Sequence, residues 1–409
     1  MSTYTKMSFD THEFRVDTIA PYVLGSVAET VRALRRDGQD VIDLSQINPD
    51  VGLPQVGVDR LVQASLQPHN HKYSASQGIT RLREAICERY SKVYGVSLNP
   101  HDDAVVTMGT KEGLGHLLLA MLEPGDSVVV PTPAYPVHNA AIRIAGGNFL
   151  GVPIPEQGSK TLSDKSNDFF EALEETVAKS WPKPKAMILN FPHNPTTVEV
   201  DISFFERLVG FAKAEQIYLL HDFSYSDIYF SDKAPPSILQ AKGAKEVAVE
   251  FYSLSKSFGI PGWRVGFCLG NPRLVSTLKK IKSYLDFGLF QPLQISSIDV
   301  LAGAEEVTAE IRSIYQSRRD ALCEGLSSIG WEVEKPSSTV FVWAKLPQKL
   351  LSMGSVKAVE HVLNSAGVAI CPGEGFDSSS RDYLRFSLGE NESRIRAAVA
   401  RIEKSLQIL

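Results

Sequence analysis

Between about residues 100 and 270, short apolar runs alternate with longer stretches whose apolar residues recur at helical spacing. The runs are DAVVTMG, DSVVVPTPAY, KAMILNF, IYLLHD and VAVEFYS. Short apolar strands separated by helices are typical of a mostly parallel sheet that is covered by helices on both faces. Ligands of such sheets bind at the carboxyl ends of the strands, so we expect the functional residues directly after these runs.

The pattern changes after about residue 300. The stretch EEVTAEIRSIYQSRRDALCEGLSSIG predicts one long amphipathic helix that ends at Gly330, and WEVEKPSSTVFVWAKL predicts a hairpin or meander. Further helices are expected near VKAVEHVLNSAG and ESRIRAAVARIEKSL, and the early helix in SVAETVRALRRDG is expected to pack on this unit. For a chain of 409 residues two domains are the default expectation. We predict a large α/β domain over residues 50–300, with a mostly parallel mixed sheet, and a smaller α+β domain from residues 1–49 and 301–409.

Charge and cysteine usage exclude several classes of function. The formal net charge is −5, so no basic field favours binding to nucleic acid or to an anionic membrane. No apolar run reaches the ~18 residues that a membrane span needs, and the N-terminal stretch lacks the apolar core of a secretory signal. The four cysteines are scattered and predict reduced thiols in a cytoplasmic protein; they are Cys87, Cys268, Cys323 and Cys371.

The stretch FYSLSKSFGIPGWRVGF places Lys256 and Arg264 among apolar and small residues. A lysine in a desolvated pocket has a lowered pKa and becomes a nucleophile or a Schiff-base former. Ser253, Ser255 and Arg264 are suited to binding a phosphate. The alternative is a solvated turn that carries two surface charges.

Two other segments place polar residues after a predicted strand. Gly109, Thr110 and Lys111 lie between a strand and a helix, where backbone N–H groups favour a phosphate; the alternative is a plain turn with a capping threonine. Asn194 lies between two prolines in FPHNPT and is placed to bond a ligand oxygen; the alternative is an ordinary Asn-Pro turn.

Asp222 ends the apolar run IYLLHD, where a buried carboxylate must be paired or hydrogen-bonded, and Tyr225 follows three positions later. The alternative role for Asp222 is a helix N-cap. Together the candidates fit one ligand that has a phosphate, an aromatic cation and an aldehyde. Lys256 would bond the aldehyde, Asp222 would meet the ring nitrogen, and Asn194 with Tyr225 would meet a phenolic oxygen. This ligand is pyridoxal 5′-phosphate.

Further motifs extend over some 300 residues: Tyr73-Ser-Ala-Ser-Gln-Gly, Gly109-Thr-Lys-Glu-Gly, Pro133-Ala-Tyr-Pro, Asn194-Pro-Thr, His221-Asp-Phe-Ser-Tyr, Ser253-Leu-Ser-Lys-Ser, Gly262-Trp-Arg-Val-Gly, Lys282-Ser-Tyr-Leu-Asp-Phe-Gly and Leu384-Arg-Phe-Ser. In their order and spacing the chain resembles the fold-type I, class I/II aminotransferases over nearly its whole length. It is most similar to the alanine aminotransferase branch, which also contains methionine- and LL-diaminopimelate-type enzymes.

The resemblance implies further roles for residues of the site. Tyr135 would stack on the cofactor ring. Tyr73 would reach the phosphate of the neighbouring subunit, which implies a homodimer with shared active sites. Arg385 would hold the substrate α-carboxylate. Asn48 would line the substrate side of the pocket, and Tyr22 would belong to a segment that closes over the substrate.

The implied function is an enzyme that uses pyridoxal phosphate to move an amino group between an amino acid and a 2-oxo acid by a ping-pong mechanism. Lys256 would be the Schiff-base lysine and general base, Asp222 and Tyr225 would complete the catalytic set, and Asn194 would also face the substrate. Ile47 stands where the branch usually has glycine, and Glu374 where an apolar or small residue is common. These departures leave open an alternative on the same fold, a β-eliminating lyase or an oxidative deaminase.

Overall fold

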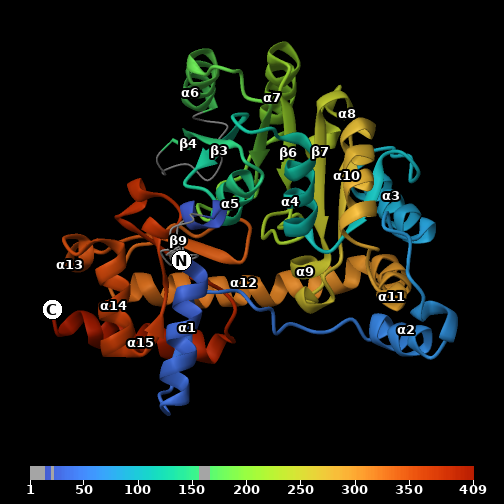
Figure 1. Ribbon diagram of the computed structural model, residues 1–409. Helices are drawn as coiled ribbons and strands as arrows, with labels where there is room; N and C mark the ends of the chain where they lie inside the picture. The colour runs from blue at the N-terminus through green and yellow to red at the C-terminus, as the bar shows by residue number, and fades with distance from the viewer. Residues whose placement is uncertain (1–13, 20–22, 156–165) are drawn as a thin grey trace, which may run out of the picture.

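The computed structural model describes residues 14–19, 23–155 and 166–409 (Figure 1). Its main element is a seven-stranded sheet in which every neighbouring pair is parallel except the two pairs that involve β8. This is the mostly parallel mixed sheet that the sequence predicts. In spatial order the strands are β2 (Ala104–Thr107), β8 (Gly266–Gly270), β7 (Ala248–Ser253), β6 (Tyr218–Asp222), β5 (Ala186–Leu189), β3 (Ser127–Thr132) and β4 (Asn148–Pro153).

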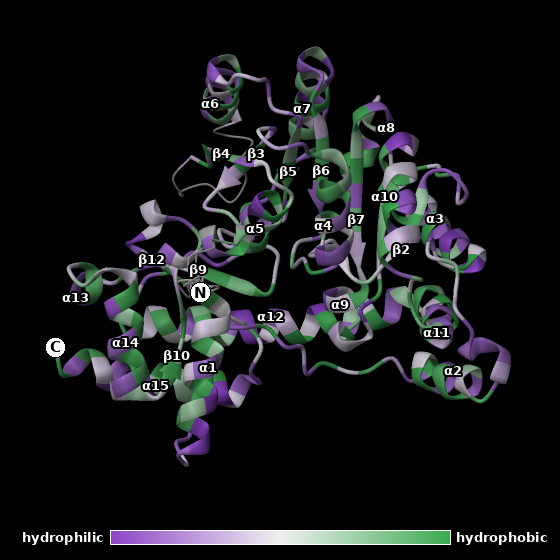
Figure 2. Cartoon of the chain, in the orientation of Figure 1, coloured by the Kyte–Doolittle hydropathy of each residue, from purple (hydrophilic) through white to green (hydrophobic). Residues whose placement is uncertain are grey.

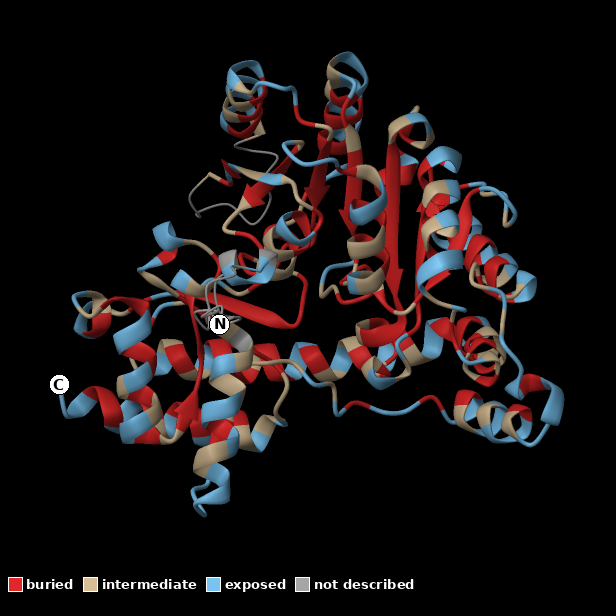
Figure 3. Ribbon diagram, viewed as in Figure 1, coloured by how far each residue is buried: buried red, intermediate tan, exposed pale blue. Residues whose placement is uncertain are grey.

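Helices cover both faces of this sheet, so its strands other than the edge strand β4 are mostly buried on both sides (Figures 2 and 3). In β3, Val128 and Val130 belong to one hydrophobic core and Val129 to the other, as the twofold side-chain period of a strand requires. The core around Val128 is completed by α4 (Thr110–Met121), α5 (Pro136–Ile144) and α10 (Pro272–Leu285). The core around Val129 is completed by α3 (Thr80–Tyr94), α6 (Ser166–Lys179) and α7 (Ile202–Glu215).

A separate hydrophobic core lies under a smaller α+β unit. Its antiparallel sheet has the order β11 (Cys371–Pro372), β12 (Tyr383–Ser387) and β9 (Phe341–Lys345), and a parallel pair joins β1 (Ile42–Asp43) to β10 (Val368–Ala369). The helices of the unit are α12 (Ala304–Ser328), α13 (Gln348–Leu351), α14 (Gly354–Ala366) and α15 (Glu392–Gln407). In Figure 1 the orange helix α12 runs from below the large sheet towards α14 and α15.

The early helix α1 (Val23–Arg36) packs on this smaller unit, as expected: Val31 shares a small core with Val41 and Ala369. The remaining described elements are helices and turns outside the units listed above. They are α2 (Gln55–Ser65), α8 (Ala244–Val247), α9 (Leu254–Ser257), α11 (Gln291–Ala302) and the 3₁₀ turns η2 (Arg15–Thr18), η3 (Pro68–His71), η5 (Ile238–Gln240), η6 (Pro261–Trp263), η7 (Gly373–Gly375) and η8 (Ser378–Ser380). Of these, α11 adds Val300 and Leu301 to the core around Val129.

The structure differs from the sequence-based expectation in residues 331–346. The predicted hairpin or meander is wrong, because the segment contains only one strand, β9, whose partner is β12. The backbone before β9 pairs elsewhere instead: Phe230 N donates to Ser337 O at 2.7 Å, and Thr339 N donates to Ile228 O at 2.9 Å. The hydrogen bonds that a hairpin would use thus join the smaller unit to the chain that follows β6.

The described residues also bear on membrane insertion and on disulfide formation. None of their helices has the length and apolarity needed to cross a membrane. The four cysteines are all buried and none forms a disulfide.

Candidate active site

A cavity of about 500 Å³ lies at the carboxyl ends of the central strands. Asp222 is the last residue of β6, Ser253 is the last residue of β7, and Asn190 directly follows β5. Functional residues are expected at this edge of a parallel sheet. The cavity is lined by Gln46, Ile47, Thr110, Lys111, Leu114, Tyr135, Val137, His138, Asn190, Asn194, Asp222, Ser224, Tyr225, Ser253, Ser255, Lys256, Pro261, Arg264, Phe341 and Arg385.

The structure brings most of the predicted site residues together in this lining: Ile47, Thr110, Lys111, Tyr135, Asn194, Asp222, Tyr225, Ser253, Ser255, Lys256, Arg264 and Arg385. Gly109 lies against the guanidinium of Arg264. Asn48 is exposed and does not line the cavity. Tyr73 is 85% exposed outside the cavity, and Tyr22 lies outside the described residues.

Lys256 lies in α9, the short helix that follows β7, and its side chain lines the cavity. Nζ donates to the carbonyl oxygen of Ile47 at 3.3 Å. Burial, together with the positive charges of Arg385 and Arg264, lowers the pKa of Lys256 to about 8. An amine with this pKa is neutral in a sizeable fraction of molecules near neutral pH, which is the state needed for attack on a carbonyl and for taking up a proton.

Asp222 is buried and is held from several directions. His138 Nε2 lies 3.3 Å from Oδ2, and Ser224 Oγ donates to Oδ1 at 2.5 Å. Asn190 Nδ2 donates to the backbone oxygen of Asp222 at 2.7 Å. These contacts fix one carboxylate orientation and supply the partners that a buried carboxylate requires.

A turn at residues 108–111, here called the phosphate turn, forms a cationic end of the cavity. Gly109 has a φ of 79° and precedes the first residue of α4, and a side chain at this position would collide with the guanidinium of Arg264. Arg264 Nη2 donates to Met108 O at 3.1 Å. Partial burial lowers the pKa of Lys111, and the nearby charge of Arg264 lowers it further. Two cations beside the first turn of a helix favour an anion.

Arg385 lies in β12 and is buried, with its guanidinium between two aromatic rings. Its Cζ is 4.1 Å from the ring centre of Phe341 and 4.8 Å from that of Phe376. Nη1 donates to Asn194 Oδ1 and Nη2 donates to Ser45 O, each at 2.9 Å. Nε is buried and has no hydrogen-bond partner among the described residues. Because an unsatisfied buried donor is costly, we expect Nε to donate a hydrogen bond to an acceptor on a bound ligand.

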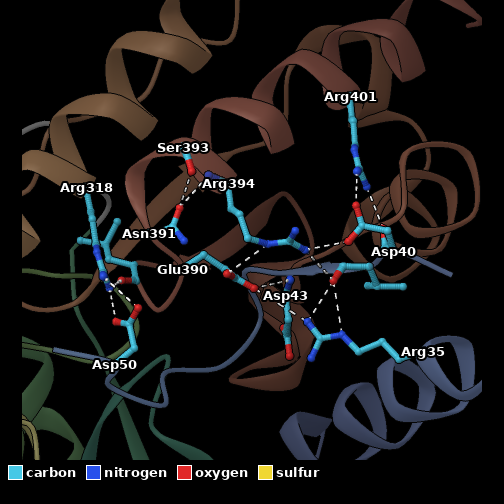
Figure 4. Close-up of polar contacts among 12 residues, drawn as sticks. Arg35, Asp40, Asp43, Asp50, Arg318, Glu390, Asn391, Ser393, Arg394 and Arg401 are labelled. Carbon is cyan, nitrogen blue, oxygen red and sulfur yellow. Dashed lines mark hydrogen bonds and ion pairs between the residues drawn. The ribbon is translucent and has the colours of Figure 1, made fainter. Parts of the chain in front are cut away.

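Gln46 and Ile47 line the cavity and belong to a segment, residues 45–50, that is anchored to the smaller unit. Arg318 Nη1 and Nη2 donate to the two carboxylate oxygens of Asp50 at 2.7 and 3.1 Å (Figure 4). Ser387 Oγ donates to Gln46 O at 2.5 Å. Figure 4 also shows the chain before this segment held to α15, with Asp40 between Arg394 and Arg401. Ile47 is therefore presented to the cavity by a segment that is fixed at both ends.

Glu374, noted in the sequence as unusual, does not line the cavity. Its Oε2 accepts from Ser355 Oγ at 2.7 Å and from Val356 N at 3.4 Å, at the start of α14. Its role in the described structure is to cap that helix.

Sequence reasoning missed several lining residues, among them His138, Ser224 and Phe341. His138 and Ser224 hold Asp222, and Phe341 packs on Arg385. His138 follows the Pro133-Ala-Tyr-Pro motif and offered a weak signal as an imidazole beside a strand end. Phe341 offered none, because an aromatic residue in an apolar run is usually core.

The lining fits a ligand that has an anion, a basic ring nitrogen and an electrophilic carbon. The phosphate turn supplies cations, Asp222 supplies a fixed carboxylate, and Lys256 supplies an amine of lowered pKa. The charges of both Arg264 and Arg385 act on Lys256, and Arg385 retains a buried donor for a further acceptor. These are the groups that pyridoxal phosphate and an amino acid would require.

Comparisons with known proteins agree with this chemistry. Residues 39–402 match the family model described as aminotransferase class I and II. The chain is 44% identical to the glutamate-pyruvate aminotransferase AlaC of Escherichia coli, over 95% of this chain and 92% of that protein. It is 36% identical to an LL-diaminopimelate aminotransferase of Moorella thermoacetica, over 96% and 97%. Substrate-bound BacF from Bacillus subtilis superposes with a TM-score of 0.89 at 32% identity, over 96% of this chain and 97% of that one.

Proposed function

The chain belongs to the class I and II aminotransferases, and we propose from this that Lys256 is the residue that binds pyridoxal phosphate and exchanges protons with the substrate. The enzyme is an aminotransferase of fold-type I that depends on pyridoxal phosphate, and its substrates are an amino acid and a 2-oxo acid. When bound, pyridoxal phosphate supplies an aldehyde that takes up amino groups and a ring that accepts electrons. The amine of lowered pKa at Lys256 is the observation that carries the residue-level proposal.

The other lining residues divide into two groups by the ligand part that they contact. We assign the phosphate to Thr110, Lys111, Ser253, Ser255, Arg264 and the backbone at Gly109. We assign the ring to Tyr135 by stacking, to Asp222 at its nitrogen, and to Asn194 and Tyr225 at its phenolic oxygen. Asp222 would keep the ring nitrogen protonated, because its carboxylate is fixed by His138 and Ser224. Tyr225 OH already lies 3.3 Å from Asn194 Nδ2, so the two can share one acceptor.

Arg385 would bind the α-carboxylate of the substrate. Its unpartnered Nε and its position between two aromatic rings support this assignment, since a stacked guanidinium keeps its donors in one plane. Asn194 Oδ1 accepts from Nη1 and would hold the guanidinium on the substrate side. Lys256 lines the same cavity as Arg385 and Arg264, and its amine in the neutral form would take a proton from the substrate Cα and return one at the end of the same half-reaction.

Assembly and organisation are further parts of the proposal. We propose a homodimer in which Tyr73 enters the site of the partner, because Tyr73 and the neighbouring Phe287 and Tyr284 are exposed aromatic residues. Asn48, which is also exposed, and Tyr22 remain assigned to the substrate side.

We propose that residues 50–300 form the large domain and that residues 1–49 and 301–409 form the small one. A cytoplasmic location is supported by the unpaired buried cysteines.

The alternative of a β-eliminating lyase or an oxidative deaminase is not favoured, because the relatives are named as aminotransferases. The test is to incubate the enzyme with single amino acids, with and without 2-oxoglutarate or pyruvate, and to identify the products by mass spectrometry. Transamination predicts continued turnover only with the acceptor, and the amino group is then found on it. Sustained release of ammonia without an acceptor, or consumption of oxygen, would contradict the proposal.

A further inference from the structure

A buried lysine outside the cavity joins two parts of the molecule. Lys282 lies near the end of α10 and is fully buried. Its Nζ donates to Glu112 Oε1 at 2.9 Å and to Asp286 Oδ1 and Oδ2 at 3.2 and 3.1 Å. A buried ammonium is tolerated only when charges and hydrogen bonds compensate it, so this cluster is held together by Lys282.

One arm of the cluster leads to the phosphate turn. Glu112 lies in the first turn of α4, and its Oε2 accepts from Met108 N at 2.7 Å. The carbonyl of Met108 in turn accepts from Arg264 Nη2 at 3.1 Å. Lys282 thereby orients Glu112, and Glu112 fixes the backbone that carries Gly109, whose neighbours are assigned to the phosphate.

The other arm leads to two exposed aromatic residues in contact, Tyr73 and Phe287, here called the aromatic rim. Asp286 Oδ1 accepts from Gly288 N at 2.7 Å. Gly288 has a φ of 76°, and a side chain there would lie 2.8 Å from Ala75 O, so this turn packs closely on the segment after Tyr73. The rings of Tyr73 and Phe287 are 4.6 Å apart.

The same cluster has the composition of a metal site, but Lys282 places its own cation against both carboxylates. Ligand atoms of Glu112, His116 and Asp286 lie within 4.8 Å of one another. The amine of Lys282 already donates to both carboxylates and supplies the cation. His116 Nδ1 lies 2.6 Å from Glu112 Oε1, which adds a further polar partner.

We propose that Lys282 is a positioning residue for two surfaces at once, the phosphate turn of its own subunit and the aromatic rim that enters the site of the partner. The inference rests on the proposed dimer and on the proposed phosphate site. Lys282 touches neither ligand. It acts through Glu112 on one side and through Asp286 on the other, so the loss of its charge would leave these two carboxylates with His116 as their only remaining side-chain partner among the described residues and would loosen both surfaces.

The test compares Lys282→Met with Lys279→Met, a lysine in the same helix whose Nζ donates to His101 O outside the cluster. Two properties are measured on the full-length protein: the dissociation constant of pyridoxal phosphate by absorbance after dialysis, and dimer dissociation by sedimentation. We expect Lys282→Met to weaken both by roughly tenfold or more, about the effect of 1.4 kcal/mol, and Lys279→Met to change neither beyond twofold.

If Lys282→Met does not fold, two variants that each alter only one of the two carboxylates bound by Lys282 still test the inference. Glu112→Gln is expected to weaken cofactor binding more than dimerisation, and Asp286→Asn is expected to do the reverse. If the Lys282→Met protein melts at a lower temperature while both dissociation constants stay within twofold of wild type, the role is only structural and the inference is overturned. It is also overturned if only one constant changes. A wild-type protein that binds no pyridoxal phosphate would instead refute the proposed function.

Discussion

Asp222 is a buried carboxylate whose orientation is fixed by His138, Ser224 and Asn190. If it stabilises a protonated ring nitrogen, Asp222→Asn should lower kcat by several orders of magnitude, on the order of ~4 kcal/mol or more in the barrier. Steady-state rates with a good amino donor are the measurement. Ser224→Ala, which removes one hydrogen bond but no charge, is the control and should cost only about 1 kcal/mol. A rate for Asp222→Asn within tenfold of wild type would contradict the assignment.

Arg385 and Arg264 are two guanidiniums of the same cavity with different assigned ligands, so they serve as matched controls for each other. Losing one member of a buried charge pair costs ~2–5 kcal/mol, so Arg385→Leu should lower kcat/KM for amino acids by a factor of roughly 30 to several thousand. Arg264→Met should mainly weaken cofactor binding. The value of kcat/KM for amino acids is measured by steady-state kinetics, and the dissociation constant of pyridoxal phosphate is measured by absorbance titration. The assignment of Arg385 to the substrate α-carboxylate fails if Arg385→Leu weakens only the binding of the cofactor.

Individual residues were predictable where their type is unusual for their place in the chain. A lysine or an aspartate beside a buried strand, such as Lys256 or Asp222, requires an explanation from the sequence alone. His138 and Phe341 were not predictable, because their types are common in buried segments and their roles depend on which distant residue they meet. The pairing of Phe341 with Arg385 is set by the register of β9 on β12, which local sequence does not encode.

The segment of residues 45–50, which lines the cavity with Gln46 and Ile47, is held in place by the contacts of Asp50 with Arg318. Ile47 in this segment is β-branched and stiff, so it should occupy space beside the substrate. We expect Ile47→Gly to raise transamination between small amino acids such as alanine and glutamate, by a modest ~1–3 kcal/mol. The measurement is kcat/KM across a series of donors of increasing size. Ile47→Val, which keeps the branch, is the control and should change little. Equal or lower rates for small donors in Ile47→Gly would refute the steric role.

Most strands of the large sheet were predicted from the sequence, because they are buried on both faces and therefore form apolar runs. The edge strand β4 was not predicted, because most of its residues are exposed or half-buried. The segment before β9 was mispredicted for a different reason. Its backbone partners are residues 228–230, over a hundred positions earlier, so no local sequence pattern predicts this pairing. Long-range pairing of this kind depends on the packing of the smaller unit against the large one.

The molecule as a whole exposes Tyr73 and Tyr284 by more than four fifths of their surface. If Tyr73 completes the phosphate site of a partner, cofactor binding and assembly are linked. We expect the wild type to sediment as a dimer, and Tyr73→Ala to weaken cofactor binding while dimers persist at high concentration. Tyr90→Phe, which alters a buried tyrosine of α3, is a control for general loss of stability. A monomeric wild type with full cofactor affinity would refute the shared site.

The most direct test of the account is to find which lysine carries pyridoxal phosphate. The holoenzyme is reduced with borohydride, which fixes the cofactor on the amine to which it is bonded, and is then digested and mapped by mass spectrometry. Because Lys256 is the buried amine whose pKa is lowered to about 8 within the cavity, the account predicts the label on Lys256 and no labelled peptide from Lys256→Ala. A label on Lys111, the other lysine of the cavity lining, or full turnover by Lys256→Ala would contradict it.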